Sequence, residues 1–311
     1  MLYHSVFRYK DGGGDIRTMD HDTTTSGEHQ MRVLILGAES LGARSMATVV
    51  ETADRTVLID PGVALGRFRF RLPPHPDEAA AAARIRESIL RHLPRTTDIV
   101  FTHYHGDHVP LKDPDCHQIA LDDFTPPEGV VVHAKGPDGI SRTSAQRRSD
   151  LENALGRGFP NAEGTDDGVV ACSPPVPHGS SGGSVMMTAV REGEACFVHA
   201  SDIQCTSPDA IGVVAGWHPS LVFVSGPPLY LHSFTREQEE NAFSNALHLA
   251  RSCTCLVIDH HLLRSMVGDR WMKGLRKATA CRILSAAEFM GEEPRLLEAM
   301  RAELWACGIP P

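Results

Sequence analysis

Short apolar runs separated by turn residues are the main pattern along the chain. Runs of this kind, bounded by Gly, Pro or Asp, predict buried β-strands. They fall into two groups. In the first half we expect strands at residues 32–36, 46–52, 56–60 and 98–102. In the second half we expect strands at residues 169–171, 184–190, 195–200, 221–224 and 254–258.

Helical segments follow each group of strands. The Ala-rich stretch after Pro76 predicts a helix over residues 77–93, and a polar helical stretch covers residues 141–155. Further helices are expected at residues 236–251, 270–289 and 293–306. Because strands followed by a helix occur twice, the pattern suits two similar halves that pack sheet to sheet, with helices outside.

Residues 1–30 differ from the rest. They contain Gly12–Gly14, Thr23–Thr25 and many charges, with little periodic hydrophobicity. We therefore expect a flexible N-terminal extension at 1–30 and a single domain over 31–311.

Composition limits the function further. The 311 residues are 41% hydrophobic and carry a net charge of −9, which disfavours binding of long nucleic acid. No apolar run is long enough to span a membrane. Residues 1–10 show no secretory signal, so a cytoplasmic location is expected.

The eight cysteines are scattered and predict reduced thiols. Nothing in the sequence decides whether the chain forms a homo-oligomer.

Four potential metal ligands lie within six residues, directly after the strand at 98–102. They are His103, His105, Asp107 and His108, in a loop that contains Gly106. Imidazole nitrogen and carboxylate oxygen are ligand types for zinc and similar divalent ions. In a tight loop, His103 and His105 could hold one ion while Asp107 and His108 hold a second. The alternative is that these residues form a histidine-rich surface turn that binds no metal.

This motif and its surroundings resemble the metallo-β-lactamase superfamily of αββα hydrolases. The likeness covers most of residues 31–285. It includes residues 56–62, which end in Asp60-Pro61-Gly62, and the strand that leads into His103. The resemblance implies an α/β fold of the metallo-β-lactamase type, an αββα sandwich of two mixed β-sheets flanked by helices.

The resemblance also implies three later ligands. They are a histidine of the first ion, an aspartate that bridges both ions and a last histidine of the second ion. His178 and Asp202 occur in the required order, and either His260 or His261 ends the following strand. His260 to Arg264 has the spacing from last ligand to Arg that the ribonuclease Z branch shows, and His261 could line the pocket instead. Several segments together resemble an uncharacterised branch of predicted metal-dependent hydrolases.

The implied activity is hydrolysis at two divalent ions, with Zn²⁺ expected and Fe or Mn as alternatives. A metal-bound hydroxide would attack a small ester, for which a phosphoester is the first choice. Asp107 and Asp202 are the expected catalytic carboxylates. Asp60 is a candidate for orienting a metal-ligating histidine. Arg44 and Arg264 could reach an anionic substrate.

Two other functions remain open on the same residues. An iron-dependent oxidoreductase would use the same scaffold, and a metal-binding protein without turnover would use the same ligands.

Overall fold

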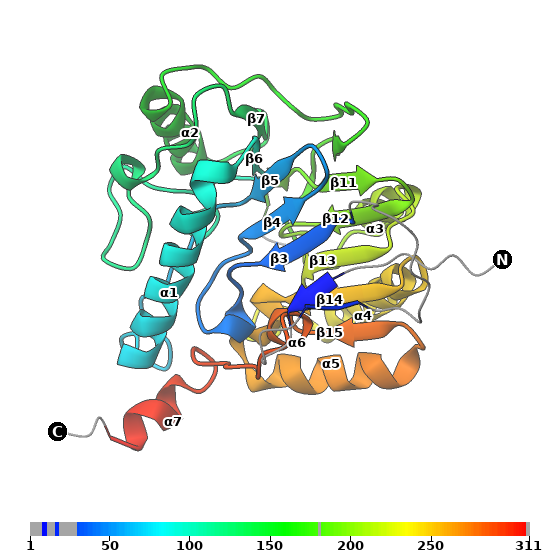
Figure 1. Ribbon diagram of the computed structural model, residues 1–311. Coiled ribbons are helices and arrows are strands. Elements are labelled where there is room, and N and C mark those ends of the chain that lie inside the picture. The colour runs from blue at the N-terminus through cyan, green and yellow to red at the C-terminus, as the bar shows by residue number, and fades with distance from the viewer. Residues whose placement is uncertain (1–7, 11–15, 19–29, 180–181, 309–311) are drawn as a thin grey trace.

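Two β-sheets pack face to face at the centre of the protein (Figure 1). The computed structural model describes residues 8–10, 16–18, 30–179 and 182–308. The first sheet has the order β2-β1-β3-β4-β5-β6-β7. Its strands are β1 (Arg8–Lys10), β2 (Ile16–Thr18), β3 (Arg32–Ile35), β4 (Thr48–Glu51), β5 (Thr56–Ile59), β6 (Asp98–Phe101) and β7 (Val131–Ala134). β3, β4 and β5 pair antiparallel, while β5, β6 and β7 pair parallel, so the sheet is mixed.

The second sheet repeats this plan. Its order is β15-β14-β13-β12-β11-β8, with antiparallel pairs from β8 to β12 and parallel pairs from β12 to β15. Its strands are β8 (Val170–Cys172), β11 (Thr188–Glu192), β12 (Ala195–His199), β13 (Leu221–Ser225), β14 (Cys255–Asp259) and β15 (Arg282–Leu284). A separate hairpin joins β9 (Val176–Pro177) and β10 (Ser184–Val185).

Helices cover the outer face of each sheet. The α-helices are α1 (Pro76–His92), α2 (Arg142–Ala154), α3 (Pro208–Gly216), α4 (Arg236–Arg251), α5 (Met266–Ala278), α6 (Ala286–Phe289) and α7 (Arg301–Ala306). Short 3₁₀ helices lie at η1 (Glu39–Leu41), η2 (Leu93–Arg95), η3 (Leu121–Asp123) and η4 (His260–Arg264). α1 packs on the first sheet, and α3, α4 and α5 pack on the second.

Alternating side chains divide the core into three layers. Leu58 and Ile99 point outward from the first sheet towards Ile85 of α1. Their neighbours Val57 and Val100 point inward, and they pack against residues of the second sheet that include Phe197, Phe223 and Val257. This period of two is what a strand buried on both faces requires. The αββα arrangement expected from the sequence is therefore present.

Most of the expected elements form, with several differences. The strand expected over 184–190 is divided between β10 and β11, which belong to different sheets. β7 and α3 occur where no element was expected. The helix expected over 270–289 is instead α5, then β15, then α6. The helix expected over 293–306 is reduced to α7 at its C-terminal end.

Of residues 1–30, the structure describes β1, β2 and Gln30. β1 pairs with β3 at Arg8 and Arg32, which extends the first sheet. Most of residues 1–30 lie outside the residues that the structure describes. The expected flexibility of this segment therefore stays a prediction.

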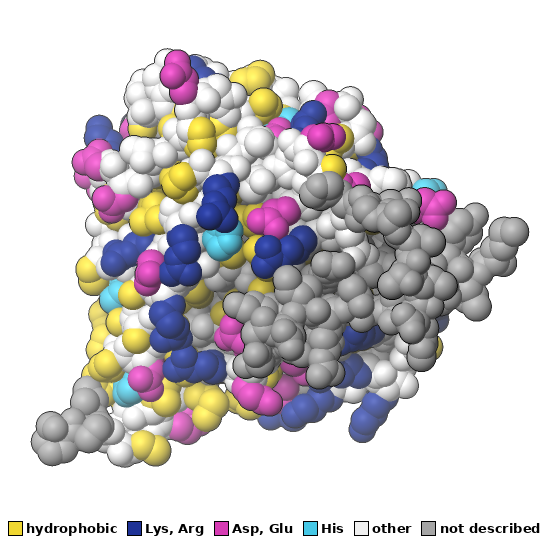
Figure 2. Space-filling model, viewed as in Figure 1, with side chains coloured by type: hydrophobic (Ala, Val, Ile, Leu, Met, Phe, Trp, Pro, Cys, Tyr) yellow, Lys and Arg dark blue, Asp and Glu magenta, His cyan; other side chains and the backbone are white. Residues whose placement is uncertain are grey.

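Surface charge is unevenly distributed. Lys and Arg side chains gather over the region of α1 on the face drawn in Figure 2, although the whole chain has a net charge of −9. Among the described residues, no helix is long and apolar enough to cross a membrane.

Candidate metal centre

The candidate site lies where β5, β6, β12 and β14 end. Each of these strands delivers a polar side chain to the same edge of the sandwich, at Asp60, His103, Asp202 and His260. In α/β folds, ligands characteristically bind beyond the carboxyl ends of parallel strands. β6 runs parallel to β5, and β14 runs parallel to β13, so the topology itself brings these residues together.

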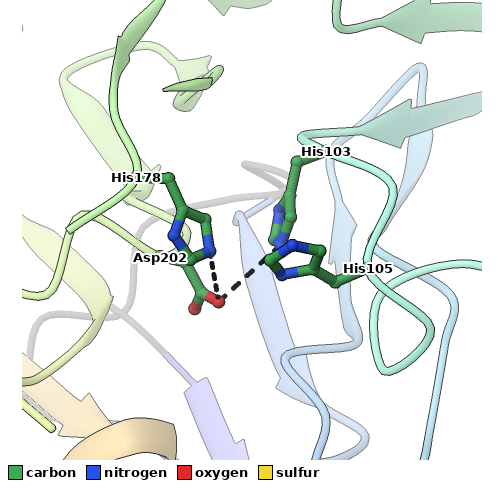
Figure 3. A group of neighbouring side chains, drawn as sticks. All are labelled: His103, His105, His178 and Asp202. Atoms are coloured by element: carbon green, nitrogen blue, oxygen red, sulfur yellow. Dashed lines mark ion pairs between the residues drawn. The ribbon is translucent and has the colours of Figure 1, made fainter. Parts of the chain in front are cut away.

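Three histidines converge on Asp202 from two sides (Figure 3). His103 and His105 come from the loop after β6, and His178 comes from the loop after β9. Asp202 Oδ2 lies 3.4 Å from His178 Nε2 and 3.7 Å from His103 Nε2. His105 is the exposed member of this group. This geometry groups the three histidines that the sequence assigns to one ion.

A second group forms on the other side of Asp202. It consists of Asp107, His108 and His260. His260 Nε2 lies 3.5 Å from Asp107 Oδ2 and 3.6 Å from Asp202 Oδ1. His108 Nε2 lies 3.5 Å from Asp202 Oδ2. Asp202 is therefore the residue that both groups share.

The donor set fits divalent metal ions. Ligands bound at 2.0–2.2 Å on a tetrahedral ion are roughly 3.4 Å apart, close to the separations around Asp202. His103 Nε2, His108 Nε2 and Asp202 Oδ1 are buried and have no hydrogen-bond partner among the described residues. Buried polar atoms are rarely left without a partner. A bound cation would satisfy all three atoms.

The local electrostatics favour metal-binding protonation states in most of the group. Burial, and then His108, hold the pKa of His103 well below its usual range. Burial and Arg264 do the same for His260. Burial alone would raise the pKa of Asp202, but the surrounding histidines, His260 first, hold it well below the usual range. Neutral imidazoles and ionised carboxylates are the forms that ligate metal.

His108 is the exception. Burial opposes its charge, but Asp202 and Asp60 together hold the pKa of His108 well above its usual range. A cation bound at His108 Nε2 would take the place of the proton on that nitrogen, while Nδ1 keeps its contact with Asp60.

A layer of polar side chains holds the ligands from behind. Asp60 Oδ2 lies 2.9 Å from His108 Nδ1 and accepts from Thr102 Oγ1 at 2.6 Å. Thr102 Oγ1 also lies 3.1 Å from His103 Nδ1 and 2.7 Å from Ser201 Oγ. The structure thus places Asp60 where the sequence analysis expected a supporting carboxylate. Thr102 and Ser201 were not anticipated, although both adjoin predicted ligands closely in sequence.

Backbone strain is concentrated at the same edge. Asp60, Ser201 and His260 all have positive φ angles, of 48°, 52° and 52°. Non-glycine residues adopt this conformation at a free-energy cost, and they do so most often at functional sites. Each of these residues lies at or just after the end of a strand, where the chain must turn to aim a side chain at the centre.

His260 and His261 occupy different places. His260 is fully buried and belongs to the group with Asp107 and His108. His261 is partly exposed; its Nδ1 lies 3.0 Å from Tyr230 Oη and its Nε2 lies 3.2 Å from Asp202 Oδ2. Burial, and then Arg264, lower the pKa of His261 to about 4. The contact between Tyr230 and His261 was not predicted from the sequence.

The two expected arginines have different surroundings. Arg264 is buried at the site, and its guanidinium lies 3.2 Å from Asp107 Oδ2, 3.2 Å from Glu39 Oε2 and 2.9 Å from His260 Nε2. Arg44 instead forms two hydrogen bonds to Glu298, of 2.6 and 2.7 Å. Its guanidinium therefore pairs with the C-terminal segment, and among the described residues it forms no hydrogen bond or ion pair with a metal-ligand candidate.

A pocket of about 410 Å³ adjoins the first group of histidines. Its floor is His103, His105 and His178. Its walls come from the start of α2, including Ser141 and Ser144, and from residues 182–184. A volume of this size suits a small molecule.

Comparison with known proteins agrees with this architecture. Residues 42–109 match the family model of the Metallo-beta-lactamase superfamily. The UPF0282 protein of Methanosarcina mazei is 49% identical over 278 residues, which cover 88% of this chain and 92% of that relative. The chain belongs to the UPF0282 family. The UPF0282 protein MK0213 of Methanopyrus kandleri is 36% identical over 294 residues, which cover 88% of this chain and 99% of that relative.

Among solved structures, a metal-dependent hydrolase of the beta-lactamase superfamily is similar, with a TM-score of 0.46 and 13% identity. The alignment covers 82% of this UPF0282 chain and 96% of that chain. The two mixed sheets with outer helices confirm the fold that the sequence predicted, and the match of residues 42–109 agrees with the resemblance to the metallo-β-lactamase superfamily.

Proposed function

We propose that this UPF0282 protein is a dinuclear metal-dependent hydrolase of a small phosphoester. The observation that carries the proposal is the position of Asp202, which belongs to the first donor group and lies 3.5 and 3.6 Å from His108 and His260 of the second. In this assignment His103, His105 and His178 bind the first ion. Asp107, His108 and His260 bind the second ion, and Asp202 contacts both. The match of residues 42–109 to the Metallo-beta-lactamase superfamily supports this assignment.

His260, rather than His261, is the proposed last ligand. Its Nε2 atom has ligand-like separations to both Asp107 and Asp202. Arg264 Nη2 lies 2.9 Å from the same nitrogen, so metal loading requires this contact to give way while Arg264 keeps Asp107 and Glu39 as partners. His261 is partly exposed, and its Nδ1 atom contacts Tyr230 Oη.

Two divalent ions, with Zn²⁺ as the first choice, would supply a water of lowered pKa and polarise the ester. The chain's own residues do the remaining work. Asp60 holds the Nδ1 atom of His108, which directs Nε2 towards Asp202. Asp107 is 17% exposed and fixed by Arg264, so it is placed to carry a proton between the reacting atoms and solvent.

The pocket supports a phosphoester over a neutral ester. α2 starts at its wall, with Ser141 as the N-cap whose side chain accepts from Ser144 N. Unpaired N–H groups and the helix dipole favour an anion at this end of a helix. Ser184 also lines this pocket, and its hydroxyl donates to Asp138 O and Gly139 O at 3.4 Å. An anionic substrate group would therefore lie between α2 and the histidines.

Metal analysis of natively purified protein, followed by substrate screening, tests the proposal. We expect about two ions per chain and turnover of a phosphodiester such as methyl 4-nitrophenyl phosphate, ahead of thioesters and lactones. His105→Ala and Asp202→Ala should abolish metal loading without unfolding the chain. His248→Ala, an exposed histidine of α4, is the matched control and should load normally.

Two results would overturn the proposal. Full metal content in both His105→Ala and Asp202→Ala would show that the centre is placed wrongly. Iron with a characteristic optical spectrum and no hydrolysis would favour an oxidoreductase, because His and carboxylate ligands also suit iron.

A further inference from the structure

A short hairpin next to the metal centre alternates arginine with phenylalanine. Its sequence over residues 67–71 is Arg-Phe-Arg-Phe-Arg, and no acidic residue occurs between Asp60 and Asp77. Arg69 and Leu72 exchange two backbone hydrogen bonds, of 3.1 and 2.9 Å, so Phe70 and Arg71 form the turn. Both turn residues have positive φ, of 54° and 64°. Turns of this kind normally use Asn or Gly. A Phe and an Arg adopt this conformation only at a cost in conformational free energy.

The two phenylalanines do not belong to the core. Phe68 is 66% exposed and Phe70 is 53% exposed, the highest values among the large hydrophobic side chains of the described residues. Arg67 and Arg71, which flank them in sequence, are also exposed. Apolar side chains left in water beside cations stabilise the fold little, and such patches mark binding surfaces.

The hairpin is joined to the metal centre through Arg69. The Arg69 guanidinium lies over the ring of Phe70, at 4.9 Å, and over the ring of Tyr230, at 5.0 Å. Its Nη2 also donates to Arg264 O at 3.1 Å. Tyr230 in turn contacts His261, with nearly parallel rings at 9°. These contacts hold the hairpin on the side of the centre formed by His261.

A series of ring-to-ring contacts connects the pocket with the hairpin through the candidate metal ligands. Neighbouring ring centroids are 4.1 to 6.4 Å apart along this series. The series runs through His178, His103, His108, His260, His261 and Tyr230. A molecule that reaches from the pocket to the hairpin would therefore cross the proposed metal ions.

We propose that residues 67–71 bind a short single-stranded nucleic acid and present its phosphodiester to the metal centre. Exposed aromatic rings and arginine planes stack on bases, and guanidinium groups pair with phosphates in a fork geometry. Three arginines are enough for a few nucleotides only, in agreement with a chain whose net charge is −9. This proposal rests on the proposed function, since it names the class of phosphoester.

Two other occupants fit less well. In a twofold contact between two copies, the hairpin would meet itself and bring arginines opposite arginines, which is repulsive. An anionic membrane shares the attraction for arginine and phenylalanine, but a membrane gives no reason for the contact between Arg69, Tyr230 and His261.

Fluorescence anisotropy of the full-length, metal-loaded protein with labelled phosphorothioate (dT)₈ tests the proposal, because this probe resists hydrolysis. Phe68→Ala and Phe70→Ala should each weaken binding about tenfold. Arg67→Ala should reduce the slope of log affinity against log salt by about 0.7. Val131→Ala, 49% exposed on β7, and Arg236→Ala, on α4, are the controls and should bind as the wild type does.

Several outcomes would overturn it. They are an absence of (dT)₈ binding, binding that the Phe variants leave unchanged, and Phe-dependent binding to phosphatidylserine vesicles without oligonucleotide binding. A dimer that the Phe variants dissociate, again without oligonucleotide binding, would count equally against it. The assay needs no turnover. If the wild-type protein hydrolyses methyl 4-nitrophenyl phosphate but does not bind (dT)₈, the hairpin proposal alone is rejected. If it binds (dT)₈ through the phenylalanines but hydrolyses no phosphodiester, the proposed function alone is rejected.

Discussion

Asp60 accepts hydrogen bonds on both carboxylate oxygens, and each oxygen positions a different part of the metal loop. Oδ1 accepts from Thr102 N, at the point where the chain leaves β6. Oδ2 lies against His108 Nδ1 and Thr102 Oγ1. A fully buried carboxylate with three such partners fixes the ring orientation of His108, and polar partners of this kind tune metal affinity strongly.

We therefore expect Asp60→Asn to lower the affinity for metal about 10- to 100-fold. The amide keeps the size of the side chain, but its NH₂ group cannot accept from His108 and Thr102 as a carboxylate oxygen does. Competition with a chelating dye would measure the change. Asp54→Asn, at an exposed position, should leave the affinity unchanged. Equal affinities in the two variants would show that Asp60 does not support the centre.

Sequence reasoning finds residues of the site where local spacing carries the signal. His103, His105, Asp107 and His108 are recognisable because one loop holds all four. Asp60 is recognisable from its place after a strand. Tyr230 and Glu39 are not, because their contacts with His261 and Arg264 join residues 31 and 225 positions apart. Only the fold brings such pairs together.

Helices and strands, like single residues, could be predicted where the signal is local in the sequence and not where it depends on the fold. Strands with uniform apolar runs and helices with clear caps were predicted within a few residues. β15 was wrongly read as helix, since only its pairing with β14 makes residues 282–284 a strand. α3 holds two glycines and two valines, which are weak helix formers, and it forms because Ser207 caps it and the core buries Ile211. β7 lies in a run of three valines that follows Gly129, and such a run after a glycine predicts a β-strand.

The approach of the turn after β5 to the metal loop depends on Gly62. A Cβ atom at this position would lie 2.3 Å from Val109 N and 2.4 Å from His108 C. Both are backbone atoms of the loop that carries the ligands, so neither can rotate away. Glycine at this point is what lets Asp60 reach His108.

Gly62→Ala should consequently push the loop outward, lowering both metal content and the free energy of unfolding, the latter by about 1–3 kcal/mol. Urea unfolding and elemental analysis would measure the two effects. Gly212→Ala is the matched control, because nothing lies within 4 Å of its Cβ position and it sits inside α3. That change should stabilise the protein by about 0.4–1 kcal/mol. A Gly62 variant that behaves like the control would refute the close approach.

At the scale of the whole molecule, buried ion pairs tie the C-terminal segment to the first half of the chain. Arg301 is fully buried and forms two hydrogen bonds to Glu78 of α1, of 2.7 and 2.6 Å. It also donates to Gly66 O at 2.8 Å and to Leu72 O at 3.1 Å, at the base of the Arg-Phe hairpin. The C-terminal segment therefore supports both α1 and the surface proposed to bind nucleic acid.

Removing one member of such a pair leaves the other charge buried without a partner. We expect Arg301→Met to lower the free energy of unfolding by about 3–5 kcal/mol. Arg32→Met breaks the half-exposed pair with Glu51 instead and should cost at most about 1 kcal/mol. Urea unfolding at neutral pH would compare the two losses.

A double-mutant cycle separates the ion pair from the packing of the arginine stem. Glu78→Gln keeps an acceptor for the backbone N–H of His75, the N-cap of α1. It removes the charge and replaces the oxygen that accepts from Arg301 Nη2 with an NH₂ group. If Arg301 and Glu78 stabilise the protein as a pair, the double variant loses less than the sum of the two single losses, by about 0.5–3 kcal/mol. Strictly additive losses would mean that the carboxylate charge contributes nothing through Arg301. In that case the arginine would hold the hairpin base through Gly66 O and Leu72 O alone.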